Sequence, residues 1–91
     1  MKELVLTVHS EVQIGSIALS TAQAFLYYKL AAYHYRCDRH WKKAYEVCMQ
    51  ALNSLPSDFK YNYMIYEELV IVSYYIGELN CGYDAAESIL F

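Results

Sequence analysis

A His-Cys-His triplet is the arrangement in this sequence best suited to bind a metal. His34, Cys37 and His40 are three residues apart, so on one continuous helix their side chains would point roughly the same way. Imidazole and thiolate are zinc ligands, but a closed tetrahedral site needs a fourth ligand, and none lies nearby in the sequence. We also expect Asp38 and Arg39 to break the helix. A buried Cys37 beside a turn is therefore favoured, with a small metal- or thiol-dependent protein kept as an alternative.

Two further sets of residues have side chains suited to catalysis. A nucleophilic cysteine needs a histidine as base and a third group to orient it, whereas Cys48 falls at a spacing typical of a packed thiol. Glu67 and Glu68 are adjacent, and neighbours on a helix project about 100° apart, so they cannot share one site as acid and base. We expect both carboxylates on a solvated edge. The sequence predicts no catalytic residue, no bound metal and no cofactor, and hence a protein that is not an enzyme.

Positive charge is concentrated in one segment, RCDRHWKK, at residues 36–43. Such a cluster could bind phosphate or nucleic acid. Asp38 dilutes its charge, however, and Trp41 falls at a packing position. The formal charge of the whole chain is −3, which repels nucleic acid and anionic lipid. The sequence therefore argues against nucleic acid as a partner.

The cysteine count and the hydropathy pattern bear on the compartment. Cys37, Cys48 and Cys81 are odd in number and have no paired short spacing, which favours reduced thiols. The first eight residues hold too short an apolar run for a signal peptide. Nowhere do about 18 consecutive apolar residues occur, so no membrane span is predicted. We expect an intracellular, cytoplasmic protein.

Helical periodicity dominates the middle of the chain, which has only one proline. Apolar residues recur at helical spacing from residue 20 to 37, and Ser20 with Gln23 reads as a capping box that starts this helix. After a turn at residues 38–39, a second helix carries apolar residues from Ala44 to Leu55. Pro56 is expected to end it.

Two more helices are expected in the C-terminal part. Ser57 and Asp58 are predicted to cap a helix that runs to Gly77. A last helix begins near Asn80 and reaches the chain end with apolar residues and no cap. An apolar end of this kind indicates truncation, a partner or a dimer contact.

The first nineteen residues allow two interpretations. The β-branched run from Leu4 to Val8 could form a strand, whereas Val8, Val12, Gly15 and Leu19 share one helical face. We favour helix, in which Gly15 would let a neighbouring helix approach closely. A capping box from Ser10 to Gln13 would instead start the helix at Glu11.

Bulky and small residues alternate in two successive blocks, as tightly packed antiparallel helices require. The first block consists of Tyr28, Ala31, Ala32, Tyr35, Trp41, Ala44, Cys48, Ala51 and Pro56. The second repeats most of these positions 38 residues later, at Tyr66, Leu69, Val70, Ser73, Leu79, Gly82, Ala86 and Ile89. This spacing resembles that of a tetratricopeptide repeat (TPR). Small residues at Ala44 and Gly82 are expected to let the two helices of each hairpin lie close together.

A second resemblance rests on the stretches LYYKLAAYHYR, AYEVCMQAL and YEELVIVSYYIGELNCGYDAAESIL. They are similar to helical-repeat segments that accompany family 2 glycosyltransferases. This resemblance implies an accessory role in a glycosyltransferase system. Transfer activity is not implied, because the chain has no Asp-x-Asp signature and no room for a catalytic domain.

The resemblance to tetratricopeptide repeats implies an all-α fold of about five helices, with antiparallel hairpins stacked as a short TPR-like α-solenoid. Residues 1–91 would form a single domain, with 1–20 as an N-terminal half repeat or extension, 21–57 as repeat one and 58–91 as repeat two. Two hairpins are near the lower limit for a stable solenoid. Self-association into a homo-oligomer is therefore left open.

The same resemblance implies a non-catalytic interaction or scaffold module. In such arrays the first helix of each hairpin lines the concave face, and eleven tyrosines supply rings suited to packing or recognition. We expect a tyrosine-lined groove for a peptide or helix of a protein partner, with a glycosyltransferase as one candidate and no membrane partner. The predicted groove residues are Lys29, Tyr33, Arg36, Glu67, Ile71 and Tyr74.

Overall fold

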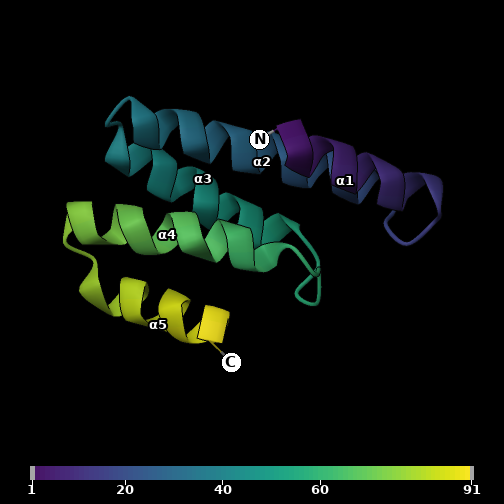
Figure 1. Cartoon of the computed structure of the whole chain (residues 1–91). Helices are drawn as coiled ribbons and strands as arrows, with labels where there is room; N and C mark the ends of the chain where they lie inside the picture. Colours follow the sequence, from purple (N-terminus) through teal and green to yellow (C-terminus); the bar gives the residue numbers. More distant parts are fainter. Residues whose placement is uncertain (1, 91) are drawn as a thin grey trace.

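The computed structural model describes residues 2–90 and contains five α-helices and no strand within that range. The helices are α1 (Lys2–Gln13), α2 (Leu19–Cys37), α3 (Trp41–Ser54), α4 (Asn62–Ile76) and α5 (Leu79–Leu90). Successive helices from α2 to α5 run antiparallel and lie side by side, and α1 lies along α2 (Figure 1). Helix α4 contacts α2 as well as α3 and α5. The prediction of an all-α chain with about five helices is confirmed.

The N-terminal segment is a helix and not a strand, as we favoured. The alternative start at Glu11 is wrong, because Ser10 and Glu11 lie inside α1. Gly15 is not in a helix: its φ is +84°, in the left-handed region, and a Cβ on it would meet no atom within 4 Å. Gly15 therefore supplies the turn between α1 and α2, and the predicted close approach of a neighbouring helix at this residue is wrong.

The predicted capping box at the start of α2 is also wrong. The helix already includes Leu19, and the capping residue is Ala18, in an extended conformation without a side-chain hydrogen bond. At the other end, the turn predicted at residues 38–39 is present. Arg39 has a φ of +63°, and its amide donates to the carbonyl of Arg36 at 3.1 Å. A single left-handed residue is thus enough to reverse the chain into α3.

Proline ends α3 as expected, but Ser57 and Asp58 do not cap the next helix. Helix α4 begins only at Asn62, after a turn in which the amide of Phe59 donates to the carbonyl of Pro56 at 3.1 Å. The Asn62 side chain holds this turn by donating to the same carbonyl at 2.7 Å. Gly77 then ends α4 with a φ of +80°, as predicted.

The core is formed where α2, α3 and α4 meet. Phe25 is fully buried, with its ring centroid 5.3 Å from that of Phe59 and 5.6 Å from that of Tyr61. Ala44 is fully buried, and a Cβ on Gly82 would lie 3.3 Å from the Cβ of Ser73. Gly82 therefore lies at the seam between α4 and α5, as the repeat pattern predicted, and Ala44 is part of the core.

An aromatic stack connects α3 with the end of α4. The rings of Trp41 and Tyr75 are nearly parallel, with an interplanar angle of 6° and centroids 4.1 Å apart. Trp41 is half-buried, in keeping with the packing position that its spacing indicated.

In the C-terminal helix, Ala85 is buried, whereas Ala86, the repeat equivalent of Cys48, is only half-buried. The predicted apolar end at Phe91 lies outside the described residues.

Candidate functional site

The structure divides the six predicted groove residues into two groups. Four of them line one open pocket of about 330 Å³ between α2 and α4. These four are Lys29, Tyr33, Arg36 and Glu67; Leu4, Met64 and Glu68 complete the lining. Tyr74 instead lines a different groove, between α4 and α5, and Ile71 is exposed on α4. We refer to the first opening as the α2–α4 pocket.

A buried carboxylate lies at the base of the α2–α4 pocket. Oε1 of Glu68 accepts a hydrogen bond from Nζ of Lys29 at 2.8 Å, and Oε2 accepts one from Nε of Arg36 at 2.5 Å. The Glu68 side chain is only 4% exposed. Burial raises the pKa of this carboxyl, but the hydrogen bonds from Arg36 and Lys29 outweigh burial and lower its pKa overall. The expectation that Glu68 sits on a solvated edge is therefore wrong.

The register of α2 explains why these two cations meet one carboxylate. Lys29 and Arg36 are seven residues apart, which is close to two helical turns, so both lie on one face of α2. Ala32 occupies the same face between them and is fully buried. Its small side chain leaves room for the neighbouring helix, and Glu68 is the α4 residue that reaches both cations.

The rim of the pocket remains available to a ligand. Tyr33 is exposed, and the guanidinium carbon of Arg36 lies 5.3 Å from its ring centroid, a distance typical of a cation–π contact. The neighbouring thiol of Cys37 raises the pKa of the Tyr33 hydroxyl. Glu67 is exposed on the opposite wall and adds a carboxylate. The pocket thus combines an aromatic ring with both signs of charge.

Helix α1 borders this pocket, a role that the sequence analysis did not assign to it. Val8 is almost fully buried, and Leu4 lines the pocket itself. The Glu11 carboxylate accepts hydrogen bonds from Lys60 and Tyr61, which precede α4. These bonds lower the pKa of Glu11. An amphipathic helix of this chain is therefore seated beside α2, next to the predicted groove.

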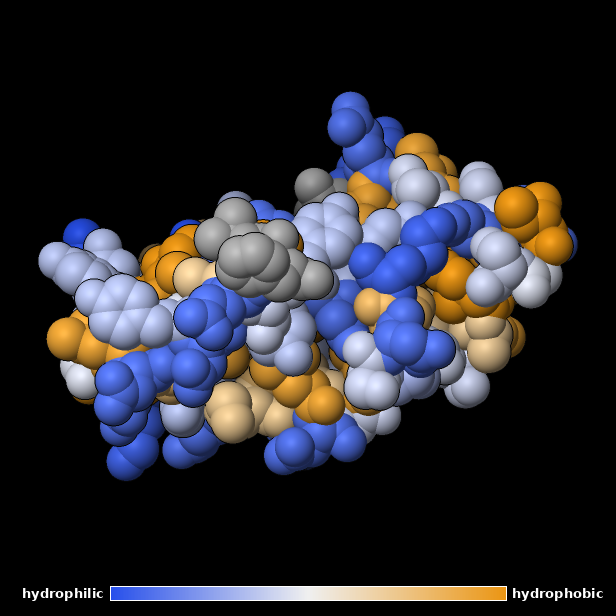
Figure 2. Space-filling view, turned by 90° about the horizontal axis from the view of Figure 1, so that it is seen from below, coloured by the Kyte–Doolittle hydropathy of each residue, from blue (hydrophilic) through white to orange (hydrophobic). Residues whose placement is uncertain are grey.

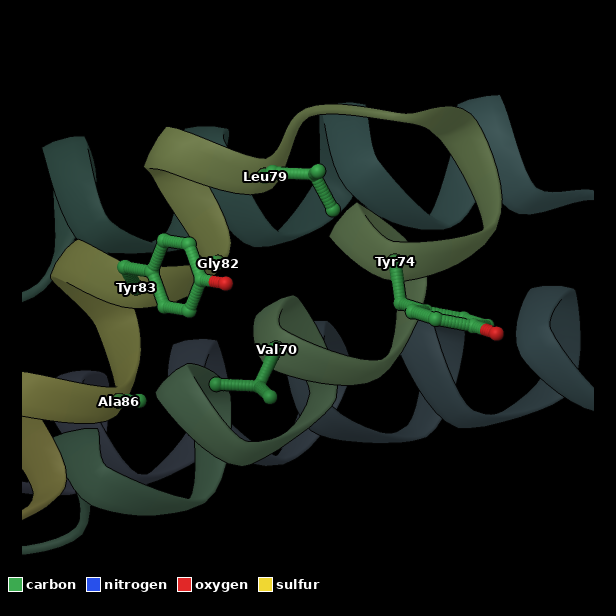
Figure 3. Close-up of a pocket in the computed structure, with 6 residues that line it drawn as sticks. All are labelled: Val70, Tyr74, Leu79, Gly82, Tyr83 and Ala86. Atoms are coloured by element: carbon green, nitrogen blue, oxygen red, sulfur yellow. The ribbon is translucent and has the colours of Figure 1, made fainter.

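A second opening, the α4–α5 groove, is almost entirely apolar. Its volume is about 240 Å³, and it is lined on α4 by Val70, whose side chain points toward α5, and by Tyr74, whose ring extends away from α5 (Figure 3). The α5 residues that line it are Leu79, Gly82, Tyr83 and Ala86. Exposed fractions are high, at 55% for Leu79 and 68% for Tyr83. The face that carries α5 shows apolar surface interrupted by hydrophilic residues (Figure 2).

Tyr74 lies on α4, as predicted, but it lines the α4–α5 groove and not the α2–α4 pocket, and Tyr83 was not among the predicted groove residues. The signal for Tyr83 was present: Leu79, Gly82, Tyr83 and Ala86 follow the i, i+3, i+4, i+7 spacing of one helical stripe. That stripe was interpreted as packing. Only the arrangement in space shows that no helix in residues 2–90 covers its outer part.

The residues proposed for metal binding do not come together. Within residues 2–90, no group of three His, Cys, Asp or Glu side chains could hold a metal ion, so His34, Cys37 and His40 are not assembled into a site. Cys37 is exposed, which corrects the expectation that it is buried. Cys48 is fully buried, and burial raises its pKa to about 12, which is the opposite of what activates a nucleophilic thiol.

The basic segment is partly used within the fold. Arg36 is paired with Glu68, and Nζ of Lys43 lies 5.8 Å from the ring centroid of Tyr35.

Among the described residues, no helix has the length and hydropathy needed to cross a membrane. The class of protein shown is a small all-helical domain with a polar pocket and an apolar groove. Comparisons with protein-family models, curated proteins and solved structures give no match for this chain.

Proposed function

We propose that this protein is a non-catalytic interaction or scaffold module of the TPR-like type, which binds a peptide or helix at the α2–α4 pocket. The observation that carries the proposal is the convergence of Lys29, Tyr33, Arg36 and Glu67 from two helices around one open pocket. An exposed tyrosine beside paired charges can give a polypeptide both ring contacts and hydrogen bonds.

The packing of the helices supports a TPR-like interpretation. The pairs α2–α3 and α4–α5 are antiparallel hairpins, and the first helices of the two, α2 and α4, contact each other. Ala44 is fully buried in α3, and Gly82, 38 residues later, packs closely on Ser73 of α4. Stacked hairpins of this kind present their first helices on one face, where repeat proteins bind partners.

The position of α1 indicates what kind of ligand this face accepts. Leu4, Val8 and Val12 recur every four residues and turn an apolar stripe toward the body of the domain, while Glu11 pairs with Lys60 at the edge. The domain therefore already holds one amphipathic helix next to the pocket. A partner helix of mixed charge could bind the rim in the same way, through apolar residues spaced by three or four and a polar residue near Tyr33.

The test is affinity capture with the full chain and two variants, followed by quantitative mass spectrometry. Tyr33→Ala removes a ring from the pocket rim, and Tyr27→Ala removes an exposed ring from the same helix, outside the pocket. We expect partners that are enriched by the wild-type chain to be lost with Tyr33→Ala and kept with Tyr27→Ala. Capture of a glycosyltransferase would also support the accessory role. Equal enrichment by the wild type and by Tyr33→Ala would contradict the proposal.

A further inference from the structure

The α4–α5 groove corresponds to a surface of the first hairpin that is partly buried. All six residues that line the groove have repeat equivalents in α2 and α3, 38 residues earlier, and three of these equivalents, Arg36, Trp41 and Tyr45, are half-buried. The equivalents of Val70, Gly82 and Ala86 are Ala32, Ala44 and Cys48, and all three are fully buried. Helix α4 packs on both helices of the first hairpin, α2 and α3. Within residues 2–90, no further helix packs on the same surface of the second hairpin.

The charges that position α4 on the first hairpin are changed in the second. Lys29 and Arg36 of α2 hold Glu68 of the incoming helix α4. The residues 38 positions after these two cations are Glu67 and Tyr74. An anion therefore replaces one cation and an aromatic ring replaces the other. Suppose that a further helix packed on α4 and α5 in the way that α4 packs on α2 and α3. The residue of that helix at the position of Glu68 would then meet Glu67 and Tyr74.

From this correspondence we propose that the α4–α5 groove binds a helix of a partner protein that carries a lysine or arginine at the position where α4 carries Glu68. The cation would pair with Glu67 and lie against the ring of Tyr74, while apolar side chains above and below it would fill the groove. Glu67 also lines the α2–α4 pocket, so the two surfaces meet at this residue, but the residues that line the α4–α5 groove lie outside that pocket. The inference therefore goes beyond the proposed function.

The charge around the groove favours a basic partner more widely. No lysine, arginine or histidine occurs from Asn62 to the end of the chain. Among the carboxylates in that stretch, Glu67, Asp84 and Glu87 are exposed on α4 and α5. Glu87 follows Tyr83 by four residues, so it lies one turn along the same side of α5. A basic helix would therefore meet attraction on both walls, and an acidic helix would meet repulsion.

The proposal can be tested with two peptides that differ at one residue. Both copy Asn62–Ile76 and are stapled to hold them helical; one keeps Glu68, and the other carries Glu68→Lys. Fluorescence anisotropy with labelled peptides gives the dissociation constant for the full chain. We expect the lysine peptide to bind about tenfold more tightly than the glutamate peptide, with a preference that weakens as salt is added. In the Glu67→Lys protein the preference should reverse.

Variants of exposed residues locate the binding. Tyr83→Ala should weaken the binding of the lysine peptide about fivefold or more, because an exposed ring beside the groove contributes contact area. Tyr27→Ala is its matched control, since Tyr27 and Tyr83 are both 68% exposed. Glu46→Lys, on the exposed surface of α3, controls for the change in net charge. Thermal melting of each variant confirms that it is folded.

Several results would overturn the inference. The inference would be overturned if the two peptides bound with equal affinity or did not bind. It would also be overturned if Glu67→Lys left the preference for the lysine peptide unchanged. Loss of binding with Tyr33→Ala but not with Tyr83→Ala would place the peptide at the α2–α4 pocket, which would support the proposed function instead. Light scattering that shows a dimer dissolved by Tyr83→Ala would identify a second copy of this chain as the occupant of the groove.

Discussion

Arg36 and Glu68 are joined by two hydrogen bonds, from Nε to Oε2 at 2.5 Å and from Nη2 to Oε1 at 3.3 Å. Because Arg36 lies in α2 and Glu68 in α4, this pair connects the two hairpins. Lys29 binds the same carboxylate. The network fixes how far α4 slides along α2, and so it also fixes which residues meet at the α2–α4 pocket.

Removal of the buried carboxylate should destabilise the domain. Glu68→Gln leaves Lys29 and Arg36 without their anion, although both cations retain some access to water. We expect a loss of about 1–3 kcal/mol in the free energy of unfolding, below the range for a fully buried pair. Urea denaturation measures it. Glu67→Gln, at the exposed neighbouring position, should change stability by less than about 0.5 kcal/mol; equal effects of the two substitutions would contradict the role given to Glu68.

The same carboxylate should make stability depend on pH. The pKa of Glu68 is lower in the folded state than its ordinary value of 4.5, so below that value the unfolded chain binds the proton first. The stabilisation is therefore complete above pH 4.5 and is lost as the pH falls through the folded pKa. Denaturation curves of the wild type between neutral and acidic pH should show this loss. In Glu68→Gln the decline should be shallower, and a decline of equal slope would count against the assignment.

Close packing at Gly82 should be sensitive to added volume. Its Cβ position is 3.3 Å from the Cβ of Ser73, which is fully buried on a helix and has little freedom to move. Gly82→Val should cost about 1–3 kcal/mol through overpacking, although valine is intrinsically the better helix former. Ser88→Val places the same side chain on the exposed face of α5 and should be nearly neutral. The melting temperatures of the two variants test this prediction. A melting temperature of Gly82→Val equal to that of the wild type would show that α5 does not pack closely on α4.

Alkylation should distinguish Cys37 from Cys48. Cys37 is exposed, whereas Cys48 is fully buried with a pKa raised to about 12, so almost no thiolate is present there at neutral pH. Iodoacetamide followed by peptide mass spectrometry should label Cys37 first in the native protein and Cys48 only on unfolding. In strong urea the two should react at similar rates. Rapid native labelling of Cys48 would indicate that the α2–α3–α4 core opens readily.

The sequence predicted the number of helices and most of their ends because those features depend on neighbouring residues. Gly77 ends α4 and Pro56 follows the end of α3 for reasons of backbone conformation alone. The starts of α2 and α4 were predicted wrongly. The turn before α4 is held by Phe59 and Tyr61, whose rings pack on Phe25 in another helix. A local capping signal cannot anticipate a contact made across more than thirty residues.

What the sequence determined by itself is an all-helical chain with small residues at the seams, since helical periodicity and side-chain volume can be read residue by residue. The tertiary structure decided which of two adjacent glutamates is buried and which groove residues meet. Glu67 and Glu68 are chemically identical, and only the rotation of α4 against Lys29 and Arg36 turns one inward and the other to solvent. That rotation results from packing across hairpins, which no local pattern encodes.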